Sequence, residues 1–246
     1  MLAMSVPSPS HSATWPRRRW LAFLCCVVAA LAWDASGLDR VVMDALASPA
    51  GFPWRHEWWL ERVLHDAARQ LATLAFVALL AMVWLPWGRW RQLGRWQRLE
   101  VVTGTGLALA AVNAVKRNSL TSCPWDLQAF GGTARYVSHW SWGVSDGGPG
   151  HCFPGGHASA AMAFLAVALP WLASDRPEQR RWGIQVLVAV LAIGLLLGLT
   201  QTLRGAHYPS HTAWTLLICW AVAWLNHRLF ASMTPLNLRA RWFRRA

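Results

Sequence analysis

The sequence predicts an all-α polytopic membrane protein with six transmembrane helices in one bundle. Of its 246 residues, 55% are hydrophobic and only 14% are charged, which favours a membrane protein over a soluble one. Nineteen tryptophans, many of them beside apolar stretches, are typical of the two membrane interfaces. Most of the apolar stretches approach the ~17–25 residues that a spanning helix needs. The six stretches are residues 20–33, 70–87, 99–115, 158–173, 182–203 and 212–231.

The first apolar stretch is the weakest of the six. Asp34 limits it to about fourteen apolar residues, which is also the length of a signal-peptide core. Arg17, Arg18 and Arg19 precede it, and the Ala-Leu-Ala at residues 30–32 is similar to a cleavage site. A cleaved or twin-arginine signal is therefore an alternative, but the five later stretches favour an uncleaved first helix.

The arginines and the single lysine set the expected orientation. Cytoplasmic loops carry the excess of basic residues under the positive-inside rule. The alternate segments that include both termini hold fifteen of these residues and the other segments hold eight, so both termini are expected in the cytoplasm. The net charge of +12 does not indicate nucleic-acid binding, because these cations lie in short loops beside apolar stretches, close to anionic lipid headgroups.

The chain is expected to form one membrane domain, residues 20–231. Residues 1–19 are predicted to be a disordered cytoplasmic tail, since their start is rich in proline and serine. Residues 232–246 are predicted to be a basic cytoplasmic tail. The outward-facing segments on this topology are residues 34–69, 116–157 and 204–211. The second and third of these hold nearly all of the unusual polar residues.

Lys116, the only lysine, stands where the third apolar stretch ends. Its ammonium group is a compact donor for a phosphate oxygen. Taken alone, the residue is better explained as a snorkelling side chain that marks the end of a membrane helix.

A second motif, Phe153–Ser159, directly precedes the alanine-rich fourth stretch. Pro154, Gly155 and Gly156 permit a tight turn into a helix whose free N–H groups and dipole suit an anion. His157 at its rim is placed to give a proton to a departing oxygen. An interfacial histidine after an ordinary loop explains this motif equally well.

The third cluster, Arg204–His211, lies between the last two apolar stretches. Pro209 fits the first turn of the last helix, which leaves His207 in the turn and His211 one helical turn inside. A cation and two histidines at a membrane boundary are costly to desolvate unless they are paired or functional. The cluster therefore favours a functional site over a hydrated connecting loop.

Together these segments resemble the type 2 phosphatidic acid phosphatase superfamily, over roughly residues 99–231. The family pattern is Lys-x6-Arg-Pro, then Pro-Ser-Gly-His, then Ser-Arg-x5-His-x3-Asp. The positions that fit it are Lys116, Pro124, Pro154, Gly156, His157 and His207. The chain is also similar to a bacterial branch of the superfamily that carries Cys-Pro-Trp-Asp and Arg-Gly-Ala-His segments.

The resemblance implies a metal-independent phosphatase without a cofactor. His207 would attack phosphorus and form a phosphohistidine, and His157 would protonate the leaving group. Lys116 and Arg204, with backbone N–H groups near Gly155 and Gly156, would stabilise charge on the equatorial oxygens. Water would then release phosphate.

The chain departs from the family pattern at five positions. Cys123 stands in place of the first arginine and Gly155 in place of the serine of the second element. Thr200 and Gln201 stand in place of the Ser-Arg of the third element, and His211 in place of its aspartate. Two phosphate-binding cations are therefore missing from their expected positions, together with the carboxylate that normally orients the nucleophile.

Nearby residues are candidates for these missing groups. Arg204 lies three residues from the substituted glutamine and is a candidate for one cation. Arg117 or Arg135 is a candidate for the other. The nucleophilic histidine needs a partner that holds its tautomer, and a neutral His211 is a poorer partner than a carboxylate. Asp126 is therefore the candidate for the missing negative charge.

Cys123 and Cys152 both lie in the long outward loop, and each flanks a site motif. In an oxidising compartment they are predicted to form a disulfide that ties the Lys116 segment to the His157 turn. Two free thiols are the alternative.

The preferred function is a lipid phosphatase of the bacterial inner membrane, active on the periplasmic side. The expected partners are the bilayer and a lipid with a phosphate headgroup, such as a polyprenyl pyrophosphate, phosphatidylglycerol phosphate, phosphatidic acid or lipid A. A lipid phosphotransferase on the same fold is one alternative. A non-catalytic membrane protein that binds lipid, or haem through its histidines, is another, although haem normally needs facing histidines inside the spans.

Overall fold

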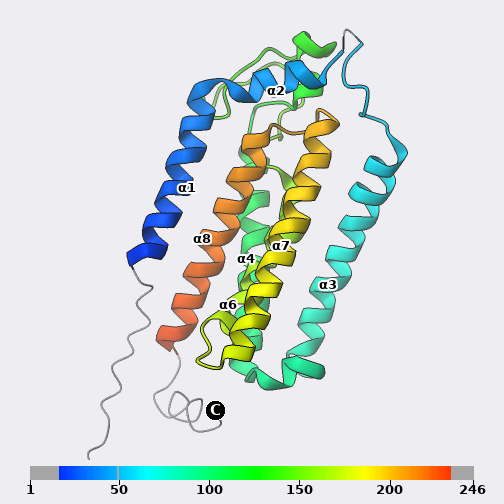
Figure 1. Ribbon diagram of the computed structural model, residues 1–246. Coiled ribbons are helices and arrows are strands. Elements are labelled where there is room, and N and C mark those ends of the chain that lie inside the picture. Colours follow the sequence, from blue (N-terminus) through cyan, green and yellow to red (C-terminus); the bar gives the residue numbers. More distant parts are fainter. Residues whose placement is uncertain (1–16, 49, 234–246) are drawn as a thin grey trace, which may run out of the picture.

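A computed structural model describes residues 17–48 and 50–233, and every regular element in this part of the chain is a helix. The long helices lie side by side in one bundle (Figure 1). The first described turn of α1 (Arg17–Ser36) and the last turn of α8 (Pro209–Met233) are directed toward the same end of it, although α1 starts short of that end. Most of each predicted tail lies outside the described residues.

The chain bends by 64° between α1 and α2 (Leu38–Leu46), so α2 lies across one end of the bundle (Figure 1). Gly37 makes the bend with φ +73°, a left-handed conformation that glycine adopts without steric cost. This bend carries Asp39 and the segment after α2 over the end of the bundle where α8 begins.

The second membrane helix starts earlier than its apolar pattern predicts. A π-helical segment, η1 (Trp59–Ala67), continues directly into α3 (Ala68–Met82), whereas the apolar stretch begins only at residue 70. The charged and polar side chains of η1 hide its helical character from a hydropathy reading. Two of them, Glu61 and His65, contact residues of the candidate site.

The remaining helices form the better-packed part of the bundle. These are α4 (Arg95–Asn118), α5 (Gly156–Met162), α6 (Leu165–Leu172), α7 (Pro177–Leu203) and α8. The short α6 is buried nearly throughout and packs against α4, α7 and α8. The short helices of the connections are η2 (Gly88–Gln92), η3 (Pro124–Asp126) and η4 (Gln128–Phe130).

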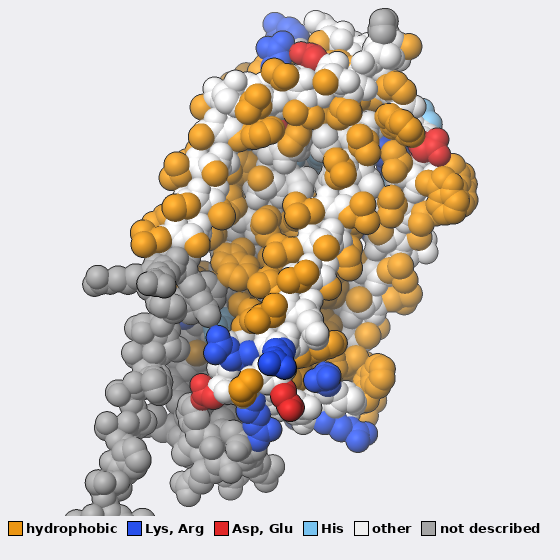
Figure 2. Space-filling model, in the orientation of Figure 1, with side chains coloured by type: hydrophobic (Ala, Val, Ile, Leu, Met, Phe, Trp, Pro, Cys, Tyr) orange, Lys and Arg blue, Asp and Glu red, His pale blue; other side chains and the backbone are white. Residues whose placement is uncertain are grey.

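All six predicted apolar stretches overlap helices, but fewer than six helices meet the length and composition of a membrane span. Four do so among the described residues, and the bent α1–α2 pair would make a fifth. The helical segment 156–172 is shorter. Apolar side chains cover the visible sides of the bundle, and most of the visible lysines and arginines gather at the end where α8 ends (Figure 2).

Candidate functional site

Three polar segments, far apart in the sequence, meet at the end of the bundle opposite the two helix ends described above. Lys116 is in the last turn of α4, His157 in the first turn of α5, and His207 in the turn between α7 and α8. The Lys116 ammonium packs against Gly156, where an added Cβ would come within 3.3 Å of Nζ. The ammonium also lies close enough to both histidines to act on them electrostatically. The three motifs, which are far apart in the sequence, therefore lie close together in one cluster.

The turn that carries His207 needs a glycine at its second position. Gly205 has φ +75°, and a Cβ there would lie 2.2 Å from the ring of Phe52. Phe52 belongs to the segment after α2, so the first part of the chain packs directly on this turn. The backbone N–H of His207 donates to the Gln201 carbonyl (3.3 Å), which fixes the turn from the α7 side.

His207 is 6% exposed, and its ring contacts two groups through the same nitrogen. Its Nδ1 lies 3.3 Å from Nδ1 of His211 and 3.4 Å from Sγ of Cys152. Burial lowers the pKa of His207 well below its usual value, so the ring is neutral at neutral pH. When His207 Nδ1–H donates to His211, the Nε2 lone pair is free, and this is the form a nucleophile requires.

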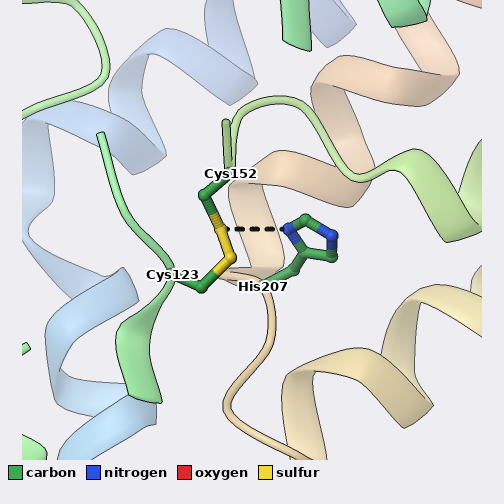
Figure 3. Close-up of side chains that lie close together, drawn as sticks. All are labelled: Cys123, Cys152 and His207. Carbon is green, nitrogen blue, oxygen red and sulfur yellow. Dashed lines mark hydrogen bonds between the residues drawn. A yellow bond between two sulfur atoms is a disulfide. The ribbon is translucent and has the colours of Figure 1, made fainter. Parts of the chain in front are cut away.

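Cys123 and Cys152 are joined as a disulfide, with Cα atoms 5.1 Å apart. The imidazole of His207 lies against it (Figure 3). The cross-link connects the segment after α4 with the residues just before α5. The two sulfurs and the histidine lie within 4.8 Å of one another, but a disulfide has no thiolate to bind a metal ion. This cluster is therefore a structural support for the histidine and does not resemble a zinc site.

His157 is held by η1. Its Nε2 lies 2.9 Å from the backbone oxygen of His65, and the two imidazoles stack with centroids 3.8 Å apart. His65 Nδ1 in turn lies 2.9 Å from a carboxylate oxygen of Asp66. A π-helical segment often marks a functional position in a helix, and here it covers the histidine that was predicted to be the acid.

Arg204 is 5% exposed and is held by residues in and just before η1. Its Nε donates to the backbone oxygen of Arg55 (2.9 Å), and its Nη2 lies 3.5 Å from Glu61. The Arg55 guanidinium lies over the Trp125 ring at 4.6 Å, and that of Arg204 lies 5.8 Å from the same ring. Two arginines therefore lie at the same tryptophan, and Glu61 partly balances their charge. Arg204 is also close enough to His157 to act on it electrostatically.

Two of the predicted phosphate ligands, Arg117 and Arg135, have exposed side chains. The guanidinium that shares the Trp125 ring with Arg204 is that of Arg55, which the sequence did not suggest. The Gly155 N–H donates to the His211 carbonyl (3.2 Å), so it is already used within the fold. Gly156 starts α5, where the first N–H groups have no partner within the helix.

The hydrogen bonds of the described residues pair His207 with His211 and do not include Asp126 among its partners. The Asp126 carboxylate accepts a hydrogen bond from the Trp125 indole (3.0 Å), and burial raises its pKa. Its role as the carboxylate partner of the nucleophile stays a prediction.

Sequence reasoning missed the contribution of residues 34–69, the first of the segments predicted to face outward. It supplies Arg55, Glu61 and His65, which contact the predicted site residues. The sequence did carry a signal for this contribution. Glu61 and His65 lie one helical turn apart beside an apolar stretch, and such polar groups are costly to desolvate at a membrane boundary unless they are paired or functional.

Comparison with known proteins gives one match. No curated protein and no solved structure matches the chain. The sequence model of the PAP2 superfamily matches residues 97–234, which include Lys116, His157, Arg204 and His207. This match covers more than half of the chain and agrees with the expected family. The chain belongs to the PAP2 superfamily.

Proposed function

We propose that this protein is an integral membrane phosphatase that hydrolyses a phosphomonoester or pyrophosphate of a membrane lipid through a phosphohistidine on His207. Membership of the PAP2 superfamily indicates phosphatase-type activity on phosphate esters. The observation that carries the proposal is the buried, neutral His207, held through Nδ1 by His211 beside Lys116 and His157. A neutral imidazole with its second nitrogen unprotonated is the chemical form that attacks phosphorus.

In the first step His207 Nε2 forms a bond to phosphorus while the bond from phosphorus to the leaving oxygen breaks. Burial lowers the pKa of His157 to about 4, and the negative charge of a bound phosphate raises it, so His157 is protonated in the substrate complex. The protonated ring gives its proton to that oxygen, so a neutral alcohol or a protonated phosphate departs. Lys116, Arg204 and Arg55 are the cations available to the equatorial oxygens, where charge stabilisation contributes most to phosphoryl transfer. The donors are preorganised by the packing around them.

In the second step water attacks the phosphohistidine. His157, now deprotonated, takes a proton from the water as oxygen bonds to phosphorus and the bond to nitrogen breaks. Inorganic phosphate leaves and both histidines return to their starting forms. In the present structure His157 Nε2 faces the His65 carbonyl, so a bound substrate has to replace that contact.

A lipid substrate is supported by the position of the site at one end of an apolar bundle. Deeper among α1, α6, α7 and α8 lies a cavity of about 440 Å³ with mostly apolar walls, lined on α8 by Leu216, Leu217 and Trp220. At 1.5 Å per residue these side chains begin roughly 8 Å along the helix from His211. A hydrocarbon chain whose headgroup occupies the site is within reach of this cavity.

The proposal includes the orientation of the protein in its membrane. The distribution of basic residues favours cytoplasmic termini and a site that faces the periplasm of a bacterial inner membrane. This topology requires six crossings, with the bent α1 and the short α5–α6 pair each counted as one.

The test is phosphate release by the purified protein in detergent, with EDTA present, from phosphatidic acid, phosphatidylglycerol phosphate, a polyprenyl pyrophosphate and lipid A. At least one lipid is expected to release phosphate, and a ³²P-labelled form of that lipid is expected to label the protein. The His207→Ala variant is expected to lose both the release and the labelling. Release that is unaffected in His207→Ala would contradict the proposal. Transfer of label to a second lipid without free phosphate would identify a phosphotransferase instead.

A further inference from the structure

The nucleophile that we assign has another histidine as its partner, and a histidine carries no negative charge to stabilise it. Building on the proposed function, we propose that Asp34, at the end of α1, supplies this charge to His207 through His139 and His211. Asp34 and His139 would then act as positioning residues, because neither contacts the reacting phosphate.

Asp34 is buried and held from three sides. Its Oδ2 accepts hydrogen bonds from the indoles of Trp140 (2.9 Å) and Trp214 (2.8 Å), and it lies 3.3 Å from His139 Nε2. The side chains of Asp34 and His139 are 7% and 9% exposed. A buried carboxylate with several donors is a fixed local charge whose effect solvent screens little.

The ring of His139 is next to that of His211. Their centroids are 5.4 Å apart and their planes are nearly perpendicular. Phe153 stacks on His139 at 4.2 Å and meets the edge of His211 at 5.2 Å, so both imidazoles have defined orientations. A continuous path of close contacts therefore runs from Asp34 through two histidines to His207.

A small polar cavity of about 20 Å³ lies along this path, lined in part by Asp34, His139, Tyr208 and His211. This is room for about one water molecule. Two buried oxygens in its wall, Oδ1 of Asp34 and the Tyr208 hydroxyl, have no hydrogen-bond partner among the described residues. One water there would donate to the carboxylate and accept from the histidine, which joins Asp34 to His211 directly.

This arrangement selects the tautomer that the reaction needs. His211 Nδ1 faces His207, so Nε2 is the nitrogen of His211 that is left for the cavity. A negative charge on that side favours a proton on Nε2 of His211 and leaves its Nδ1 lone pair to accept from His207. His207 then keeps Nε2 unprotonated, and the positive charge that develops on its ring during attack is stabilised through the chain.

Asp39 is the natural comparison, because it is a second buried carboxylate in the wall of the same cavity. Both of its oxygens are already used. Oδ1 accepts from the Trp33 indole (2.7 Å) and the Ser210 N–H (3.1 Å), and Oδ2 accepts from the Ser210 hydroxyl. Asp39 therefore holds the start of α8, and Asp39→Asn is the matched control for Asp34→Asn.

The first experiment measures steady-state phosphate release by both variants, with thermal unfolding of each protein in the same detergent. Asp34→Asn should lower kcat by roughly 30- to 100-fold, as expected for loss of an outer-sphere carboxylate, and change KM less than about twofold. Asp39→Asn should stay within about threefold of the wild type. The proposal fails if Asp34→Asn keeps a wild-type kcat, raises only KM, or loses less than Asp39→Asn.

Two further measurements apply if Asp34→Asn does not fold or if no substrate is turned over. His139→Gln keeps a donor for Asp34 and should lower kcat by at least about 10-fold, so a wild-type kcat for it contradicts the chain. Histidine ¹⁵N spectra need no substrate: His207 should be the Nδ1–H tautomer, and His139→Gln should mix the tautomers. A His207 in the Nε2–H form overturns the proposal. Wild-type inactivity with the expected tautomer would instead count against the phosphatase assignment alone.

Discussion

The part of the chain that matches the PAP2 superfamily and the part before it contribute to the site in different ways. Residues 97–234 carry all of the groups proposed to touch phosphate except Arg55. The preceding helices carry groups that hold those residues: Glu61 on Arg204, the His65 carbonyl on His157, and Asp34 behind the two partner histidines. The chemistry and its support therefore come from two regions of the sequence.

Packing differs between the same two regions. In Trp59–Met82 only 6% of the most apolar 18-residue segment is buried inside the protein, whereas in Arg95–Asn118 39% of the corresponding segment is buried. The η1–α3 helix therefore lies at the edge of the bundle, and its polar contacts gather at its start, over the site. A peripheral helix that holds two catalytic candidates is suited to yield when a substrate enters. Four predictions test this division.

The largest effect is expected at His157, in the family-matched region. His157→Ala should lower kcat/KM for a lipid substrate by about 10²–10⁴-fold, because kcat/KM reports the first step, in which the general acid is lost. The loss should shrink to about 10-fold or less with p-nitrophenyl phosphate, whose leaving group needs no protonation. His65→Ala is the control from the other region: it removes the stacked ring but keeps the backbone carbonyl, and should cost only a few-fold. Equal losses with both substrates would contradict the acid role.

The disulfide tests how strongly the family-matched region depends on its own cross-link. Cys123→Ser should lower the free energy of unfolding by about 3–4 kcal/mol, since the unfolded chain regains the entropy of a loop of this length. The measurement is the thermal unfolding midpoint with and without reductant. Cys25→Ser on the exposed face of α1 should leave the midpoint unchanged. A Cys123→Ser midpoint equal to that of the wild type would show that packing alone holds the loop.

A smaller and opposite effect is expected at Glu61, in the first region. Its carboxylate lies 3.5 Å from Arg204 and competes with a phosphate for that guanidinium. Glu61→Gln should therefore lower KM for the lipid by about threefold, within the range of a partly exposed ion pair. Glu178→Gln, at the start of α7, is the matched control and should change nothing. A higher KM in Glu61→Gln would mean that the carboxylate positions Arg204 and does not compete with phosphate.

The smallest effect concerns pH. Burial lowers the pKa of His207 well below its usual value, so acidification to pH 6 leaves the ring in the neutral, nucleophilic form. We expect the kcat/KM of His157→Ala with p-nitrophenyl phosphate, which needs no general acid, to change by less than about twofold between pH 7.5 and 6. A solvent-exposed histidine with a pKa of about 6.5 would lose most of its neutral form over the same range. A fall in kcat/KM on acidification, centred near pH 6.5 and caused by protonation of His207, would contradict the effect of burial.

The sequence by itself located the helices and the three motifs. Each apolar stretch overlaps a helix, and the spacing of Pro209, His207 and His211 correctly indicated a turn followed by a helix start. These features depend on residues close together in the chain, where periodicity and turn chemistry act. The same local signals also suggested which histidines and cations belong to the site.

Only the tertiary structure decided which groups support those residues. The sequence suggested Asp126 and either Arg117 or Arg135, while the folded chain brings Arg55 to Arg204 and leaves His211 beside His207. The contact of Arg55 with Arg204 joins residues 149 positions apart, and it requires the first part of the chain to lie over this end of the bundle. Hydropathy gives the length of a helix but not its neighbours, because the contacts between helices depend on how their faces pack in three dimensions.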